Sequence, residues 1–158
     1  MIAVKEETIV EIMDHLEEKE DDFFQTQEEL ANAHPAISAL LTDENLDLLK
    51  EEEYDLLWFV VTIVYQSFKV ENGAVEAIDL EELGAIEEKN WSLLGENAST
   101  PFRDRLDVFF DNYPQEDLLA FIEDSFESDE ELEISGPSRE VLFITAKSCL
   151  DAFIQKCA

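Results

Sequence analysis

The ten residues Leu56 to Tyr65 read LLWFVVTIVY, and no other stretch of the chain is as continuously hydrophobic. Such a run can form a membrane span, a buried β-strand or a buried helix. A membrane span needs about 20 apolar residues, whereas here residues 51–53 and Asp55 are acidic and Lys69 follows soon after the run. These charges lie too close together for the hydrocarbon core, so we exclude a membrane span.

The β-branched residues in this run favour a strand, but the pattern on both sides of it favours a helix. Apolar residues recur at intervals of three and four, which return to one helical face. They are Tyr54, Leu57, Val61, Val64 and Phe68. The acidic residues 51–53 would also complement the positive end of a helix dipole. The sequence therefore predicts a helix over about residues 51–70, buried on all sides, with both Trp58 and Phe59 buried.

Helical patterns with start and stop signals continue along the rest of the chain. The expected segments are residues 6–33 (as one helix or two), 36–41, 45–49, 79–95, 101–113, 114–126 and 139–156. Only a few residues separate the helices on either side of Pro114, so these two should form an antiparallel hairpin. No second segment with a two-residue period could pair with a strand. The predicted fold is all-α, a single domain over residues 1–158 with six to eight helices around the central one.

Capping residues support several of these boundaries. Asp79 and Glu82 have the spacing of a capping box, and Thr100 followed by proline is a typical helix start. Gly73 is a typical helix stop. At the amino terminus, Thr8 or an earlier residue could cap the first helix, and Asp21 or Asp22 a second.

The composition favours a folded but strongly acidic protein. The chain has 158 residues, of which 46% are hydrophobic, so it can bury a substantial core. Its 40 acidic and 10 basic residues give a formal charge of −30. Such a field repels nucleic acid phosphates and anionic membranes and attracts basic partners.

The two cysteines point to a reducing compartment. Cys149 and Cys157 are eight positions apart, which on one helix is about 12 Å along the axis and too far for a disulfide. The amino-terminal segment lacks the apolar region of a signal peptide. We therefore expect free thiols and a cytoplasmic location.

The two histidines, His15 and His34, are the first candidates for metal ligands. Glu11, His15 and Glu18 share a helical face, but di-metal bundles use glutamate three positions before histidine. Glu11 lies four positions before His15, and alanine lies three before His34. In the acidic stretch 124–133, neither candidate calcium loop has the glycine required at its sixth position. We therefore expect His15 to face solvent and assign no metal ligand.

Catalytic and cofactor signatures are also lacking in the sequence. There is no G-x-S-x-G motif, and neither cysteine has a histidine near it along the chain. The four glycines are too far apart for a phosphate-binding or dinucleotide-binding loop. We therefore assign no catalytic or cofactor-binding residue and expect a protein that is not an enzyme.

Aromatic residues interspersed with acids are the remaining functional signal. They occur at residues 23–24, 109–110 and 121–126. Such residues can form acid-rimmed apolar grooves that accept basic amphipathic helices, or they can belong to the core. The sequence favours an acidic protein-binding or regulatory module for a basic protein or peptide, without direct binding to nucleic acid or membranes. One alternative is a DNA mimic, another is a metal-dependent enzyme using carboxylates and His15, and the charge could also serve solubility alone.

Overall fold

The hydrophobic run lies in the middle of a long helix, α4 (Glu51–Asn72), as the sequence predicts. At its amino end the Glu53 carboxylate accepts a hydrogen bond of 2.9 Å from the Lys50 backbone N–H. At its carboxyl end Gly73 has a φ of +79°, a conformation that glycine adopts without a Cβ penalty. The Gly73 N–H donates to the Lys69 carbonyl, which closes the last turn.

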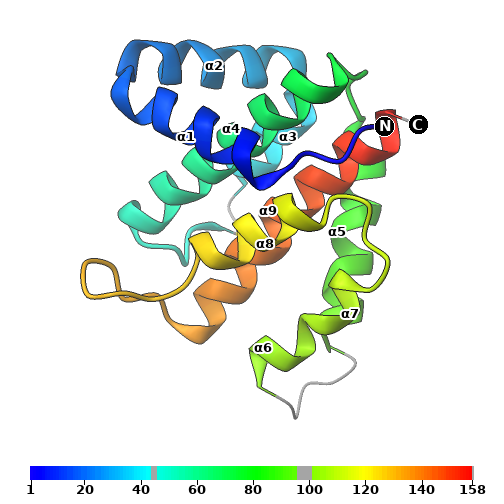
Figure 1. Cartoon of the computed structure of the whole chain (residues 1–158). Helices are drawn as coiled ribbons and strands as arrows, with labels where there is room; N and C mark the ends of the chain where they lie inside the picture. The colour runs from blue at the N-terminus through cyan, green and yellow to red at the C-terminus, as the bar shows by residue number, and fades with distance from the viewer. Residues whose placement is uncertain (44–45, 96–100, 158) are drawn as a thin grey trace.

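The computed structural model describes residues 1–43, 46–95 and 101–157, and within these ranges the regular structure is helical throughout (Figure 1). Besides α4, the elements are α1 (Glu6–Glu18), α2 (Glu20–Ala33), α3 (Pro35–Leu41), α5 (Leu80–Gly95), α6 (Phe102–Arg105), α7 (Asp107–Phe110), α8 (Glu116–Ser125) and α9 (Gly136–Cys157). If α6 and α7 count as one helix interrupted at Leu106, these described ranges hold eight helices. The all-α prediction is confirmed.

The core forms where α4 and α9 cross. The helix α9 packs most extensively on α4 and α5, while α1 and α2 cover the other side of α4. Figure 1 shows α8 lying in front of α9, and α8 also contacts α1 and α4. The predicted apolar stripe of α9 is buried, including Leu142, Cys149 and Phe153. The helix α9 is therefore a second central element that the hydrophobic run alone did not indicate.

Two predictions about aromatic burial are wrong. Trp58 and Phe59 are half-buried rather than buried, whereas Leu57, Val60 and Val61 beside them are fully buried. Phe59 lies on the flank, where its ring packs against Phe23 with 5.7 Å between centroids. On α5, Trp91 is likewise only partly covered and is 36% exposed.

Several helix boundaries also differ from prediction. Residues 6–33, for which the sequence allowed one helix or two, form two helices that meet at Lys19. The first begins after Lys5, which precedes Thr8 as the prediction allowed, but the second begins after Lys19 and not after Asp21 or Asp22. No α-helix forms over residues 46–49, where Leu46 has 3₁₀ conformation and a turn follows; Asn45 lies outside the described residues. The last helix begins at Gly136, three residues early. At α5 the predicted cap is present, because the Asp79 carboxylate accepts the Glu82 N–H at 2.7 Å.

The predicted hairpin around Pro114 is not formed. The first of its helices breaks at Leu106 and ends at Phe110, short of the expected Tyr113. The second, α8, packs mainly on α9, α1 and α4. Its buried residues, among them Leu119 and Ile122, face the main core. The two helices therefore do not pack against each other as a hairpin, although the connection between them is short. Thr100, the predicted cap of the first helix, lies outside the described residues.

Among the helices of the described ranges, none combines the length and apolar character needed to cross a membrane.

A buried histidine predicts a specific pH dependence of stability. His34, at the break between α2 and α3, is 2% exposed, and its ring contacts those of Phe153 and Tyr65 at 5.2 and 5.7 Å. Burial lowers the pKa of His34 below its ordinary value of 6.5. The unfolded chain therefore takes up this proton at a higher pH than the folded chain. The stabilising contribution of neutral His34 is complete above pH 6.5 and is lost as the pH falls toward the lower, folded pKa.

We expect the stability advantage of the wild type over a His34→Leu variant to shrink on acidification. Urea unfolding of both proteins at about pH 8 and about pH 5 measures it. Taking the difference in unfolding free energy between the two proteins at each pH cancels the pH dependence that comes from their shared carboxylates. A difference in unfolding free energy that stays constant between the two pH values would contradict this account.

Candidate functional site

The amino-terminal segment is held against α8 by a side-chain clamp. Gln115 is fully buried, and its amide oxygen accepts the Val4 N–H at 2.8 Å while its amide nitrogen donates to the Ile2 carbonyl at 2.9 Å. The Glu6 N–H donates to the Asp117 carboxylate at 3.0 Å. These bonds fix the start of α1 beside the start of α8, so that the two helices enclose a groove.

This groove, which we call the α1–α8 groove, has a volume of about 290 Å³. Its residues fall into two chemical groups, apolar and acidic. The apolar ones are Ile9, Val10, Met13, Ala120 and Phe121, and the acidic ones are Glu6, Asp117 and Asp124. The groove therefore combines an apolar floor with an acidic rim, and no basic residue lines it within the described part of the chain.

The floor combines the core residue Ile9 with residues beside the core-facing stripes of the two helices. On α1, Ile9 is buried whereas Val10 is 41% exposed. On α8, Leu118 and Ile122 fill the core whereas Phe121 is only half-buried. Met13 and Phe121 pack against the core with part of their surface. The exposed remainder, together with Val10, is the apolar surface that the groove presents.

No family model, curated protein or solved structure matches this chain. Inference about function therefore depends on the geometry and chemistry of the side chains.

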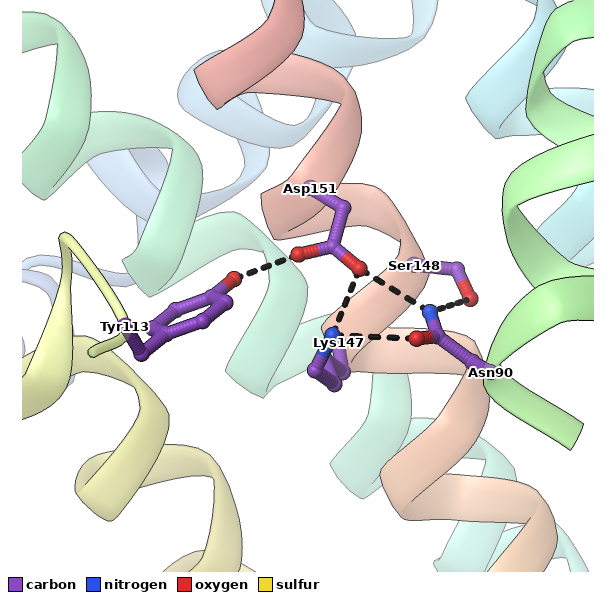
Figure 2. Close-up of polar contacts among 5 residues, drawn as sticks. All are labelled: Asn90, Tyr113, Lys147, Ser148 and Asp151. Atoms are coloured by element: carbon purple, nitrogen blue, oxygen red, sulfur yellow. Dashed lines mark hydrogen bonds and ion pairs between the residues drawn. The ribbon is translucent and has the colours of Figure 1, made fainter. Parts of the chain in front are cut away.

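A second notable site is a polar cluster inside the bundle (Figure 2). The Lys147 ammonium donates to the Asp151 carboxylate at 2.7 Å and to the Asn90 side-chain oxygen at 3.0 Å. The Asn90 amide donates to the same carboxylate at 2.9 Å and to the Ser148 hydroxyl at 3.0 Å. The Tyr113 hydroxyl donates to the other carboxylate oxygen at 2.6 Å. Figure 2 shows that the cluster joins α5, α9 and the loop before α8.

Local backbone geometry and aromatic rings complete this polar cluster. Asn112 has a φ of +55°, a left-handed conformation that asparagine tolerates, and it turns the chain at Tyr113. The Lys147 nitrogen lies 4.9 Å from the Phe109 ring centroid and 5.1 Å from that of Tyr113, within cation–π range. Burial lowers the pKa of Lys147, against the opposing effect of Asp151, and raises the pKa of Tyr113 well above its ordinary value.

The residues considered as metal ligands from sequence do not come together. The His15 side chain is 56% exposed, as predicted, and its ring is hydrogen-bonded to Asp22 at 2.9 Å. Within residues 1–43, 46–95 and 101–157, no three His, Cys, Asp or Glu side chains are grouped as metal ligands would be. The acidic stretch after α8 is an irregular connection to α9, in which Asp129 accepts two backbone N–H groups at 2.8 Å.

The two cysteines are free thiols, as predicted. Cys149 is fully buried on the α9 stripe, and desolvation raises the pKa of its thiol. A raised pKa disfavours the reactive thiolate. Cys149 is therefore a core residue, and Cys157 is half-buried near the end of α9.

The aromatic residues that lie among acids in the sequence differ in their burial. Phe109 and Phe126 belong to the core, whereas Phe24 is 55% exposed. Only Phe121 lines the α1–α8 groove. Sequence reasoning thus indicated one groove residue but missed Val10, which lies outside the apolar stripe. It also missed the polar cluster, for which the only sequence signal is the four-residue spacing of Lys147 and Asp151 on a helix.

Proposed function

We propose that this protein is a non-enzymatic, acidic binding module that takes a basic amphipathic helix of a partner protein into the α1–α8 groove. The apolar floor with an acidic rim is the observation that carries this proposal. A cytoplasmic setting is part of the proposal and is supported by the two free thiols.

The apolar floor specifies the partner's apolar face. Val10 and Phe121 present hydrophobic surface that a partner would remove from water, and burial of such surface is favourable by about 25 cal/mol per Å². Helix-in-groove recognition uses apolar side chains at positions i, i+3, i+4 and i+7 of the bound helix. Glu6 to Met13 spans seven helical steps, or about 10 Å, which accommodates two turns of such a helix.

The rim specifies the partner's charge. Glu6 and Asp117 lie together at one end, and Asp124 lies two helical turns further along α8. The whole chain carries a formal charge of −30, which would steer a cationic partner toward the protein and increase the association rate. A helix with lysine or arginine flanking its apolar stripe satisfies both requirements.

We expect the groove to distinguish two basic peptides of identical composition. The first places leucines at i, i+3, i+4 and i+7 among lysines, and the second permutes the same residues so that no apolar face forms. Calorimetric titration should give tighter binding of the amphipathic peptide. Val10→Ser should weaken that binding by roughly tenfold, because two buried methyl groups are worth about 1.5 kcal/mol.

A matched control is available on α4. Val70 is 55% exposed on a helix outside the groove, so Val70→Ser should leave peptide binding unchanged. Equal binding of both peptides, or equal effects of the two valine substitutions, would overturn the proposal. Salt-sensitive binding without peptide discrimination would instead be the behaviour expected of a DNA mimic.

A further inference from the structure

The two helices that form the α1–α8 groove run in the same direction. The hydrogen bond from the Glu6 N–H to the Asp117 carboxylate joins their starts. From there the lining residues advance along both chains, from Glu6 to Met13 and from Asp117 to Asp124. Figure 1 shows both helices running to the left from this shared end. Both helix amino termini therefore lie at one end of the groove, and both carboxyl termini lie toward the other.

The helix dipoles make the carboxyl end of the groove the more negative of the two. Each helix has a partial positive charge at its amino terminus and a partial negative charge at its carboxyl terminus. At the amino end the two helix termini offset the carboxylates of Glu6 and Asp117. At the carboxyl end Asp124 lies in the last turn of α8, and Glu17 lies in the last turn of α1, one turn beyond Met13. The charges of these two carboxylates add to those of the helix termini.

Asp124 is the carboxylate at this end that is available to a partner. It is exposed, and no side chain in the described part of the structure forms a hydrogen bond or ion pair with it. The neighbouring Glu123, by contrast, is buried and is paired with Arg103 at 2.9 Å. Lysines do not reverse the difference between the two ends, because Lys5 precedes α1 and Lys19 follows it. A basic residue of the partner should therefore bind most favourably at Asp124.

A bound helix has a dipole of its own, which favours one direction of binding. Its positive amino end is attracted to the carboxyl end of the groove, and its negative carboxyl end to the amino termini of α1 and α8. We propose that the partner helix binds antiparallel to α1 and α8, with its first basic residue at Asp124. This inference rests on the proposed function and adds to it the direction of the bound helix and the carboxylate that selects that direction.

Paramagnetic labelling of the bound peptide tests the direction. The amphipathic lysine–leucine peptide described above is given a nitroxide at its amino end or at its carboxyl end, through a thioether that cannot exchange with Cys157. NMR of the isotopically labelled whole protein then measures which backbone amides each nitroxide broadens. We expect the amino-terminal label to broaden residues 13–17 and 121–125 most strongly. The carboxyl-terminal label should broaden residues 5–7 and 115–117 most strongly.

The outcomes separate this inference from the proposed function. The reverse pattern, or equal broadening of both ends by both labels, would overturn the direction while leaving the groove as the binding site. Broadening that misses both helices would refute the proposed function and this inference with it.

A substitution at Asp124 tests the carboxylate that selects the direction. Asp124→Asn should weaken binding of the unlabelled peptide by about two- to fivefold, the range expected for an exposed ion pair. Glu28→Gln removes the same charge from an exposed position on α2, outside the groove, and should leave the affinity unchanged. Equal weakening by the two substitutions would mean that only the net charge matters and would overturn the role of Asp124.

Discussion

An Asp151→Ala variant should lose about 3 kcal/mol of unfolding free energy, because it leaves a buried lysine without its counterion. The Asp151 side chain is 20% exposed and that of Lys147 is 6% exposed, so little solvent is available to replace the lost carboxylate. The substitution also removes the acceptor for Tyr113 and one acceptor for Asn90. Chemical denaturation at neutral pH, monitored by circular dichroism, measures the loss.

A double variant distinguishes the cost of leaving the Lys147 charge unpaired from the cost of shortening a side chain. Replacing both members of the pair with apolar residues of similar volume (Lys147→Met with Asp151→Leu) removes the unpaired charge. We expect the double variant to be more stable than Asp151→Ala alone. If Asp151→Ala lowers the unfolding free energy by less than about 1 kcal/mol, the Lys147–Asp151 pair contributes no more than an exposed ion pair does. That result would contradict the assignment of a buried network.

The second large effect is expected at Phe153, where α9 meets α4. Its ring is 1% exposed and packs against those of Tyr65, Phe68 and His34, with centroids 5.2–6.0 Å apart. Phe153→Ala should therefore cost about 3–5 kcal/mol through lost contacts and the cavity left behind. In a chain of this length the midpoint of thermal unfolding should fall by roughly 10 °C.

The control for this prediction is an exposed phenylalanine. Phe24 is 55% exposed on α2, and Phe24→Ala should change the unfolding free energy by less than about 1 kcal/mol. Similar losses at the two positions would show that Phe153 does not lie in the core described here.

Hydrophobic periodicity predicted the fold class because it reports which face of each helix is buried. The offsets of three and four from Tyr54 to Phe68 predicted α4, and Gly73 correctly marked its end. Periodicity could not predict which helices pack together, since that depends on shape complementarity between surfaces. For this reason the expected hairpin around Pro114 is wrong, and the equal importance of α9 was not foreseen.

The α1–α8 groove and the polar cluster could not be predicted from the sequence. Val10 and Phe121 come from helices more than a hundred residues apart. The Gln115 clamp, the Glu6–Asp117 hydrogen bond and direct packing bring α1 beside α8. The same holds for Asn90 and Asp151, which meet across α5 and α9. Single-sequence patterns report local periodicity, whereas both sites depend on tertiary contacts between segments distant along the chain.

The most direct test of the proposed function is to map where a basic amphipathic peptide binds. Backbone amide shifts of the isotopically labelled protein, followed by NMR during titration with the peptide described above, report this residue by residue. We expect shifts concentrated on residues 6–13 and 117–124, on either side of the α1–α8 groove. Shifts spread evenly over the acidic surface, or concentrated on another face of the bundle, would contradict this expectation.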